Sequence, residues 1–232
     1  MKPIKKRIVY EDNHLICVSK LSGELAQGDQ TGDVPLVDRV REYLRVEYQK
    51  PGNVFTGLIH RIDRPVSGLV MLAKTSKGLE RMNRLFKERK IEKTYWSIVE
   101  HQPENPQGTL KNWLVKDGTK NKSRAVSANQ PGASESILHY RILAHLERYT
   151  LLEVRPETGR HHQIRVQLAA AGWVIKGDLK YGAKRSNRDG RIHLHARSLS
   201  FVHPVKQIPM KLEAPVPEED VLWRATKAFD LA

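Results

Sequence analysis

Hydrophobic and polar residues alternate in short stretches along most of the chain, and this pattern predicts many strands and few helices. The predicted strands are 7–10, 15–19, 69–73, 94–100, 113–115, 136–143, 149–154 and 192–201. Helical spacing follows Asp33 and also marks the segments 76–90 and 158–171. Because strands outnumber helices and do not strictly alternate with them, the pattern predicts a mixed α+β sheet protein.

The ends and faces of these helices can be read from single residues. Asp33 and Thr158 are the predicted N-caps of the first and third helices, and Gly172 ends the third. Apolar residues at helical spacing predict the buried faces, which are Leu36, Val40 and Leu44 in the first helix and Leu79, Met82 and Phe86 in the second. In the second helix, Lys77, Arg81 and Arg84 are expected to face solvent.

Composition adds a hint about the partner. The chain has 232 residues with 40 Lys and Arg against 26 Asp and Glu, so its formal charge is +14. This excess favours a polyanion, with nucleic acid ahead of a membrane surface. No apolar stretch is long enough to span a bilayer, and the basic N-terminus lacks the apolar run of a secretory signal. We therefore expect a single domain over 1–232, with no membrane partner.

Cysteine usage indicates the compartment. The chain has one cysteine, Cys17, which excludes an internal disulfide and a multi-cysteine zinc site. Cys17 stands in an apolar strand, where a small buried residue is expected. A reducing, cytoplasmic location is the expectation.

The densest polar cluster lies between two apolar stretches, in the segment 57–68. It contains His60, Arg61, Asp63 and Arg64, followed by a proline and a glycine that turn the chain. Two flanking arginines favour the ionised form of Asp63, as a nucleophile or base requires. A solvated turn with a local ion pair would show the same residues, so the spacing alone leaves both interpretations open.

A second cluster, 155–165, stands at the predicted start of the third helix. The free backbone N–H groups of a helix start favour an anion, and Arg160, His161, His162 and Arg165 add cationic or donor groups. Phosphate binding is the functional interpretation, and a solvated positive helix face is the alternative. The histidine pairs 161–162 and 193–195 lack further ligands at suitable spacing, so no metal is expected. No phosphate-cradling or dinucleotide glycine motif is present.

Taken together, the ordered segments resemble the RluA-type pseudouridine synthase family over nearly the whole chain. The matching segments are the opening hairpin 8–20, the signature His60-Arg61-Ile62-Asp63 with Ser67-Gly68, the strand Lys93-Thr94-Tyr95, the arginine motif 158–165 with Gly177-Asp178 and Tyr181-Gly182, and the closing Leu194-His195-Ala196. Leu21, Val66 and His161 replace the family's usual proline, threonine and threonine, which suggests a divergent subgroup. The chain begins directly at the hairpin, so the resemblance implies no N-terminal accessory RNA-binding domain.

The resemblance implies a fold and an activity. The fold is a mixed, mostly antiparallel central sheet flanked by helices, with a catalytic cleft across it. The activity is isomerisation of specific uridines in rRNA or tRNA to pseudouridine by a monomer, with the target base flipped out of its stack and with no metal or organic cofactor. The implied catalytic residues are Asp63, Tyr95 and Arg165, with Arg165 pairing Asp63, and the implied substrate-binding residues are His60, Arg61, Arg160, His162 and Leu194.

Two other functions remain open at this stage. A non-catalytic RNA-binding or ribosome assembly factor would carry the same positive charge, but it gains nothing from the carboxylate of Asp63. A hydrolase acting on a nucleoside would normally need a second positioned carboxylate, for which Glu157 is the nearby candidate. The residues do not identify the RNA. They also leave open three chemical paths, namely attack on the uracil ring, attack on the anomeric carbon and formation of a glycal.

Overall fold

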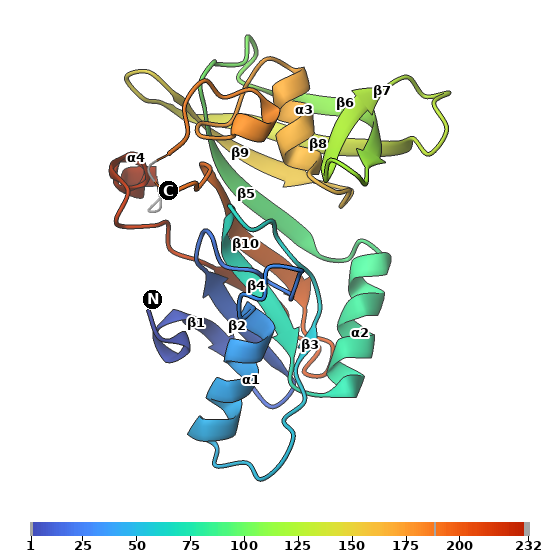
Figure 1. The fold of residues 1–232 in the computed structure, drawn as a ribbon, viewed down its shortest axis with the longest axis vertical. Coiled ribbons are helices and arrows are strands. Elements are labelled where there is room, and N and C mark those ends of the chain that lie inside the picture. The colour runs from blue at the N-terminus through green and yellow to red at the C-terminus, as the bar shows by residue number, and fades with distance from the viewer. Residues whose placement is uncertain (1, 188, 230–232) are drawn as a thin grey trace. The chain divides into compact units, whose positions relative to one another are not determined.

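The computed structural model describes residues 2–187 and 189–229, and the chain divides into two compact units (Figure 1). The first unit comprises Met1–Glu92 and Ala196–Val216. The second unit comprises Lys93–His195 and Pro217–Ala232. Each unit therefore contains two separate stretches of the chain.

The first unit is built on an antiparallel core of strands. β1 (Ile8–Glu11) pairs with β2 (Leu15–Lys20), and β2 pairs with β4 (Ser67–Ala73) in a register that places Lys20 opposite Gly68. The short β3 (Gly57–Leu58) also pairs with β4, while β10 (Leu194–Val202) pairs with β11 (Pro209–Glu213). Every residue of β4 is buried, as its continuous apolar sequence predicts.

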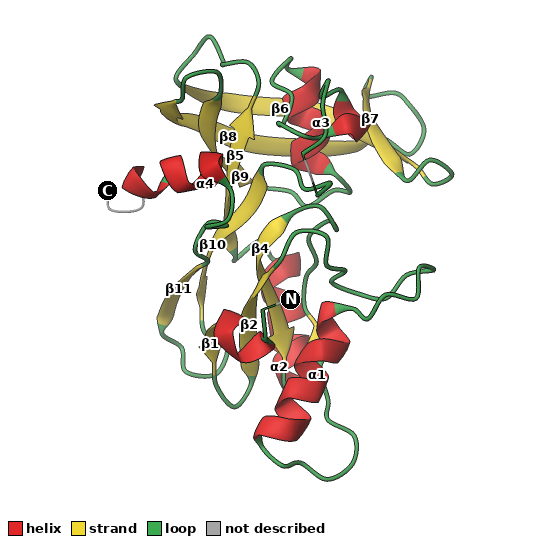
Figure 2. Ribbon diagram, turned by 60° about the vertical axis from the view of Figure 1, so that its left-hand side comes forward, coloured by secondary structure: helices red, strands yellow, loops and turns green. Residues whose placement is uncertain are grey.

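Two helices of 12 residues complete the first unit (Figure 2). α1 (Leu36–Glu47) packs against the 3-10 helix Ile4–Arg7, and α2 (Ser76–Lys87) packs on β3 and β4. The three predicted core positions of α1 are fully buried, and each stabilises the fold by about 1.5–3 kcal/mol relative to exposure. Thr75 caps α2 by accepting from the Gly78 N–H, and Met82 joins the core that also holds Cys17.

The second unit is built on an antiparallel sheet. β5 (Glu92–Val99) pairs with β9 (Thr150–Pro156), β9 with β8 (Ser134–His145), β8 with β6 (Gln107–Asp117), and β6 with β7 (Lys122–Val126). The strand order is therefore β5-β9-β8-β6-β7. α3 (Gln163–Ala170) packs on β6 and β7, and it is followed by the 3-10 helix Leu179–Tyr181. The chain then ends in α4 (Val221–Ala225) and a 3-10 helix, Lys227–Phe229.

The α+β class predicted from the pattern is confirmed, and the differences from the sequence prediction are local. The predicted N-cap role of Asp33 is wrong: Pro35 precedes α1 without a side-chain cap, and the Asp33 carboxylate instead pairs with Arg64 at 2.5 Å. β3, β7, β11 and α4 were not predicted, because their short segments carry little periodicity. Within the described residues, no helix combines the length and the apolar character that crossing a bilayer requires.

Candidate active site

The segment 59–66 of the first unit connects β3 to β4 and carries three of the predicted site residues. His60 is held by two contacts, since its Nε2 accepts from the Met71 N–H at 3.2 Å and its ring stacks on Phe86 of α2 at 5.1 Å. Arg61 is exposed and Asp63 is partly exposed. A turn follows, closed by the Val66 N–H donating to the Asp63 carbonyl oxygen at 3.0 Å. The turn thus follows directly after the partly exposed Asp63.

The loop after β2 clamps this turn through backbone groups. The Gly23 N–H donates to the Arg64 carbonyl at 2.8 Å, and Arg64 Nε returns a bond to the Gly23 carbonyl at 3.0 Å. Ser22 Oγ donates to the Pro65 carbonyl at 2.8 Å. Since each bond joins the loop to a different group of the turn, the position of Asp63 is over-determined.

Lys20 holds the same clamp from inside. Its ammonium is fully buried and donates to the carbonyl oxygens of Leu21, Glu24 and Arg64 at 2.9, 2.8 and 3.1 Å. Burial lowers the pKa of Lys20 to about 7, against the opposing charges of Glu24 and then Asp63. The Asp63 charge therefore acts on a buried ammonium in the same unit, an electrostatic interaction that the sequence prediction did not include.

Gly68, the glycine of the predicted signature, is required by a close backbone approach. Its φ is +111°, and a Cβ there would lie 2.3 Å from the Ala196 carbonyl oxygen of β10. Only glycine fits this position, because both the conformation and the space exclude a side chain. The signature glycine thus lets β4 and β10 approach each other immediately after the Asp63 turn.

Tyr95 belongs to the second unit, on β5 opposite Val154 of β9. Tyr95 is partly exposed, whereas its neighbour Trp96 is 6% exposed. This alternation of one exposed and one buried aromatic is the one that the strand pattern predicts.

Arg165 lies on α3, and its guanidinium is buried against Asp178. Its Nε and Nη2 donate to the two carboxylate oxygens of Asp178 at 2.7 and 2.8 Å, with the two side chains 5% and 1% exposed. The guanidinium also lies over the Tyr181 ring, 5.0 Å from its centre. Asp178 and Tyr181 belong to the segments that match the family, but the sequence analysis gave them no role. The motif therefore already contained both residues that contact Arg165. The pairing of Arg165 with Asp63 stays a prediction.

His162 is joined to the same cluster through Tyr181. The Tyr181 hydroxyl lies 2.8 Å from His162 Nδ1 and accepts from the Ser123 N–H at 2.9 Å. His161 stacks on His162 at 3.8 Å, and its Nδ1 lies 2.8 Å from Ser123 Oγ. The structure therefore brings His162 and Arg165 together, and β7 supports both histidines.

The predicted helix start at Thr158 is wrong, because α3 begins five residues later. His162 has φ +54°, a left-handed conformation that interrupts a helix. The Thr158 hydroxyl donates to Gln163 Oε1 at 2.7 Å and accepts from the Ile137 N–H, so it is engaged elsewhere. Gln163 Oε1 also accepts from the Arg160 N–H at 3.0 Å, which leaves the Arg160 side chain exposed at the bend.

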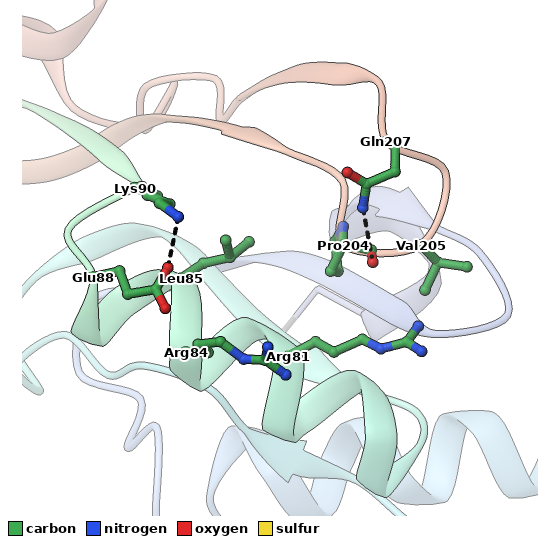
Figure 3. Close-up of a pocket in the computed structure, with 8 residues that line it drawn as sticks. All are labelled: Arg81, Arg84, Leu85, Glu88, Lys90, Pro204, Val205 and Gln207. Atoms are coloured by element: carbon green, nitrogen blue, oxygen red, sulfur yellow. Dashed lines mark hydrogen bonds and ion pairs between the residues drawn. The ribbon is translucent and has the colours of Figure 1, made fainter.

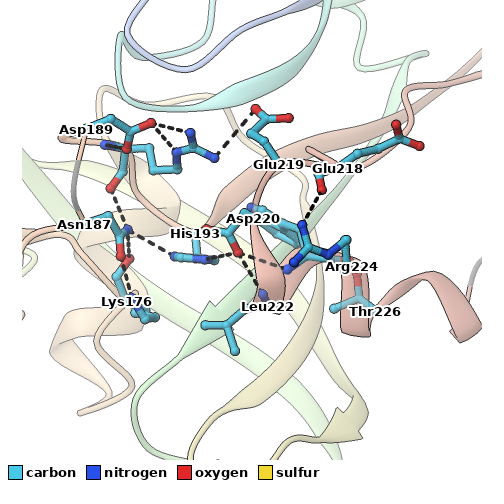
Figure 4. A network of polar contacts seen from close by, with 12 residues as sticks. Lys176, Asn187, Asp189, His193, Glu218, Glu219, Asp220, Leu222, Arg224 and Thr226 are labelled. Atoms are coloured by element: carbon cyan, nitrogen blue, oxygen red, sulfur yellow. Dashed lines mark hydrogen bonds and ion pairs between the residues drawn. The ribbon is translucent and has the colours of Figure 1, made fainter.

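The basic loop 176–191 is tied to the C-terminal segment of the same unit (Figure 4). His193 is 1% exposed, with Asn187 on its Nδ1 and the Asp220 carboxylate 3.1 Å from its Nε2. Burial opposes ionisation of Asp220, but the His193 hydrogen bond and charge prevail and lower its pKa well below the usual range. Lys184 and Arg185 are exposed, Arg188 lies outside the described residues, and Leu194 is buried. The loop is thus anchored while Lys184 and Arg185 remain exposed to solvent.

No group of three or more His, Cys, Asp or Glu side chains is placed to hold a metal ion within residues 2–187 and 189–229. Cys17 is buried, and desolvation raises the pKa of its thiol to about 12. The expectation of a small buried residue at this position is confirmed.

Comparison with known proteins identifies relatives of the chain. The family model described as RNA pseudouridylate synthase matches residues 14–170. A ribosomal large subunit pseudouridine synthase C of Buchnera aphidicola is 32% identical over 93% of this chain and 68% of its own length. An uncharacterized RNA pseudouridine synthase of Zymomonas mobilis is 30% identical over 94% of this chain and 97% of its own length. The chain spans about two thirds of the length of the ribosomal relatives it matches.

Solved structures of the same fold include two human proteins. The human RNA pseudouridylate synthase domain containing 4 structure has a TM-score of 0.80 at 23% identity, covering 96% of this chain and 93% of that one. The human domain containing 1 structure has a TM-score of 0.72 at 21% identity, covering 97% and 95%. These matches confirm the fold that the resemblance implied.

Proposed function

The chain belongs to the RNA pseudouridylate synthase family, whose members are isomerases of uridine in RNA, and from this premise we propose that it converts specific uridines of large-subunit ribosomal RNA to pseudouridine. The observation that carries the proposal is the Asp63 turn, which lies within the matched segment and whose backbone carbonyls accept hydrogen bonds from three residues, Lys20, Ser22 and Gly23. Relatives named for the large ribosomal subunit support this RNA class ahead of tRNA.

Asp63 is the proposed catalytic carboxylate. The reaction breaks the N–C bond between uracil and ribose and forms a C–C bond in its place, so the ring is released, reoriented and rejoined without net gain or loss of atoms. Attack on the ring, attack on the anomeric carbon and formation of a glycal all require an ionised carboxylate at the target nucleotide.

Tyr95 and Arg165 are proposed to complete the catalytic set. The partly exposed phenol of Tyr95 is proposed to pack on the target base and to move a proton. The bidentate bond to Asp178 holds the Arg165 guanidinium in one geometry, which suits a role in orienting a carboxylate. The pairing of this guanidinium with Asp63 is part of the proposal.

Substrate binding is assigned to two exposed arginines and to three less exposed residues. Arg61 is exposed, and its planar guanidinium can stack in the space left by a flipped base. Arg160 is exposed at the bend before α3 and suits a phosphate. His60, His162 and Leu194 are proposed to line the bound nucleotide. All of these groups come from one chain, so we propose a monomer acting in the cytoplasm, with no membrane partner.

The test combines mapping in cells with one substitution. Pseudouridine is mapped in large-subunit rRNA from cells with and without the gene, and the deletion is complemented with wild type, Asp63→Asn or Asp38→Asn. Asp38 is an exposed carboxylate on α1 and serves as the matched control. We expect a site that disappears on deletion and returns with wild type and Asp38→Asn only. Return of the site with Asp63→Asn would refute catalysis by this carboxylate, and an unchanged rRNA map would refute the substrate class.

A further inference from the structure

A hollow of about 690 Å³ lies in the first unit between α2 and the turn 204–207, outside the residues assigned to the reaction (Figure 3). Arg81, Arg84 and Leu85 of α2 form one wall, and Pro204 and Val205 form the facing wall. We call this hollow the α2 groove. Its lining combines guanidinium groups with apolar surface.

The helical wall of the groove is strongly basic. Arg81 and Arg84 stand three positions apart, so their like charges share one face of α2, which is unfavourable without an anion between them. Both side chains are exposed, and neither makes an ion pair or a hydrogen bond within the part of the chain that the structure describes. Further exposed cations follow along the same helix and its C-terminal turn, namely Lys77, Lys87, Arg89 and Lys90, against the acidic Glu80 and Glu88.

The facing wall is rigid before any ligand arrives. His203 is fully buried, and its Nδ1 accepts from the Val205 and Lys206 N–H groups at 3.2 and 3.0 Å. Burial lowers the pKa of His203 against the opposing charge of Asp12, whose carboxylate lies 3.0 Å from the His203 Nε2. Gln207 closes the turn by donating to the Pro204 carbonyl at 3.2 Å. A preformed wall removes part of the ordering cost of binding.

The helix that lines the groove also supports the Asp63 segment. The last turn of α2 carries Phe86, on which His60 stacks at 5.1 Å. His60 precedes Asp63 by three residues, a separation of at most about 11 Å along the chain. A polymer whose target nucleotide lies at Asp63 would therefore pass close to α2 with its flanking nucleotides.

We propose that the α2 groove binds the sugar-phosphate backbone of the substrate RNA beside the target nucleotide, with Arg81 and Arg84 on phosphates. Guanidinium groups bind phosphate oxygens through paired hydrogen bonds, and the apolar surface of Leu85, Pro204 and Val205 suits a ribose or a base face. Neither arginine is paired to a carboxylate within the described residues, so binding breaks no ion pair of these two side chains. This inference rests on the proposed function, because it takes RNA as the substrate.

The first experiment measures the affinity of the full chain for a fluorescent large-subunit rRNA transcript at several salt concentrations. Each phosphate contact to single-stranded RNA contributes about 0.7 to the slope of log affinity against log salt. The double variant Arg81→Gln/Arg84→Gln should lower the magnitude of that slope by about 1.4. Between 1 M and 0.1 M salt, its affinity should therefore increase about 25-fold less than the affinity of the wild type. In turnover, KM rises and kcat stays unchanged.

The matched control is Arg41→Gln/Arg45→Gln, which removes two exposed guanidinium groups from α1, each already paired to a carboxylate. A slope change of the same size in both double variants would mean that only net charge matters and would overturn the inference. An unchanged slope with Arg81→Gln/Arg84→Gln would do the same, and it is the result expected if the groove holds an acidic protein instead. Failure of the wild type to bind RNA or form pseudouridine would instead refute the proposed function.

A second experiment locates the RNA directly. Cys17 is buried, so a thiol placed at Arg84→Cys is the accessible one for attaching an azidophenacyl photo-crosslinker. We expect crosslinks to the transcript from this position and none from Arg45→Cys on α1. Absence of crosslinks at Arg84→Cys, with the labelled protein still binding the transcript, would overturn the inference.

Discussion

Removal of the Asp178 charge is the sharpest test of how Arg165 is held. The change Asp178→Asn keeps the shape of the side chain and removes the charge that accepts two bonds from Arg165 at 2.7 and 2.8 Å. Arg165 is 5% exposed, so the substitution takes the charge of Asp178 away from a buried guanidinium. The Tyr181 ring, 5.0 Å away, compensates only in part.

The expected cost follows from burial. Removing one partner of a buried ion pair destabilises a protein by about 3–5 kcal/mol. Asparagine retains one acceptor oxygen, so we expect the lower end, about 3 kcal/mol. For a chain of this size that corresponds to a loss of about 6–12 °C in Tm.

Tryptophan fluorescence during urea unfolding is a suitable assay, because all four tryptophans lie in the same unit as the pair. The matched control is Glu135→Gln, which removes the partner of Lys111 in that unit. The two ion pairs have the same 2.7 Å separation, but Lys111 and Glu135 are 61% and 40% exposed. The exposed pair should contribute about 1 kcal/mol or less.

A double substitution separates the two parts of the cost. Arg165→Met/Asp178→Leu removes both charges and should restore most of the lost stability, since an apolar replacement of a buried pair is often neutral. A midpoint shift for Asp178→Asn no larger than that for Glu135→Gln would refute the reasoning. So would a double variant as unstable as the sum of its single variants.

Three further predictions concern the catalytic loop and the charge around it. Gly68→Ala should prevent folding of the first unit, because the new methyl group would lie 2.3 Å from a backbone oxygen of β10, and the thermal melt should be compared with that of Gly118→Ala, where nothing lies within 4 Å. Lys20 has a pKa of about 7 in the folded protein against 10.5 unfolded, so the unfolded state binds more protons between these values and stability from this group rises with pH from about 7 to 10.5. Lys20→Met should remove that rise in urea titrations, and an unchanged pH slope would contradict burial of the ammonium. Lys184→Gln/Arg185→Gln should flatten the salt dependence of RNA affinity, which binding titrations at several salt concentrations would check.

Patterns that repeat within one element could be predicted from the sequence. The spacing of Leu36, Val40 and Leu44 is enough to place the buried face of α1, because the helical period decides which side chains meet the core. The continuous apolar run of β4 likewise marks a strand buried on both faces. The Asp63 segment could be singled out for the same reason, since its charges interrupt two apolar stretches.

Contacts between distant residues could not be predicted in this way. Asp33 has the residue type of an N-cap, but its carboxylate pairs with Arg64, 31 positions away. Thr158 has the same local signal, but its hydroxyl is engaged by Ile137 and Gln163. In both cases a tertiary partner outcompetes the local cap, and the sequence contains no period that would reveal that partner.

The basic residues behind the net charge of +14 also differ in what the sequence can predict about them, because some are buried in ion pairs and others are exposed. Arg7 and Arg165 are buried against Glu24 and Asp178, so these two pairs hold the fold and present little charge to RNA. Arg81 and Arg84 are exposed, although the helical pattern alone could assign them only to a solvated face. Counterion release depends on cations that reach phosphates. A measured salt slope therefore counts the exposed cations that contact RNA, and it is expected to fall well short of the count of basic residues.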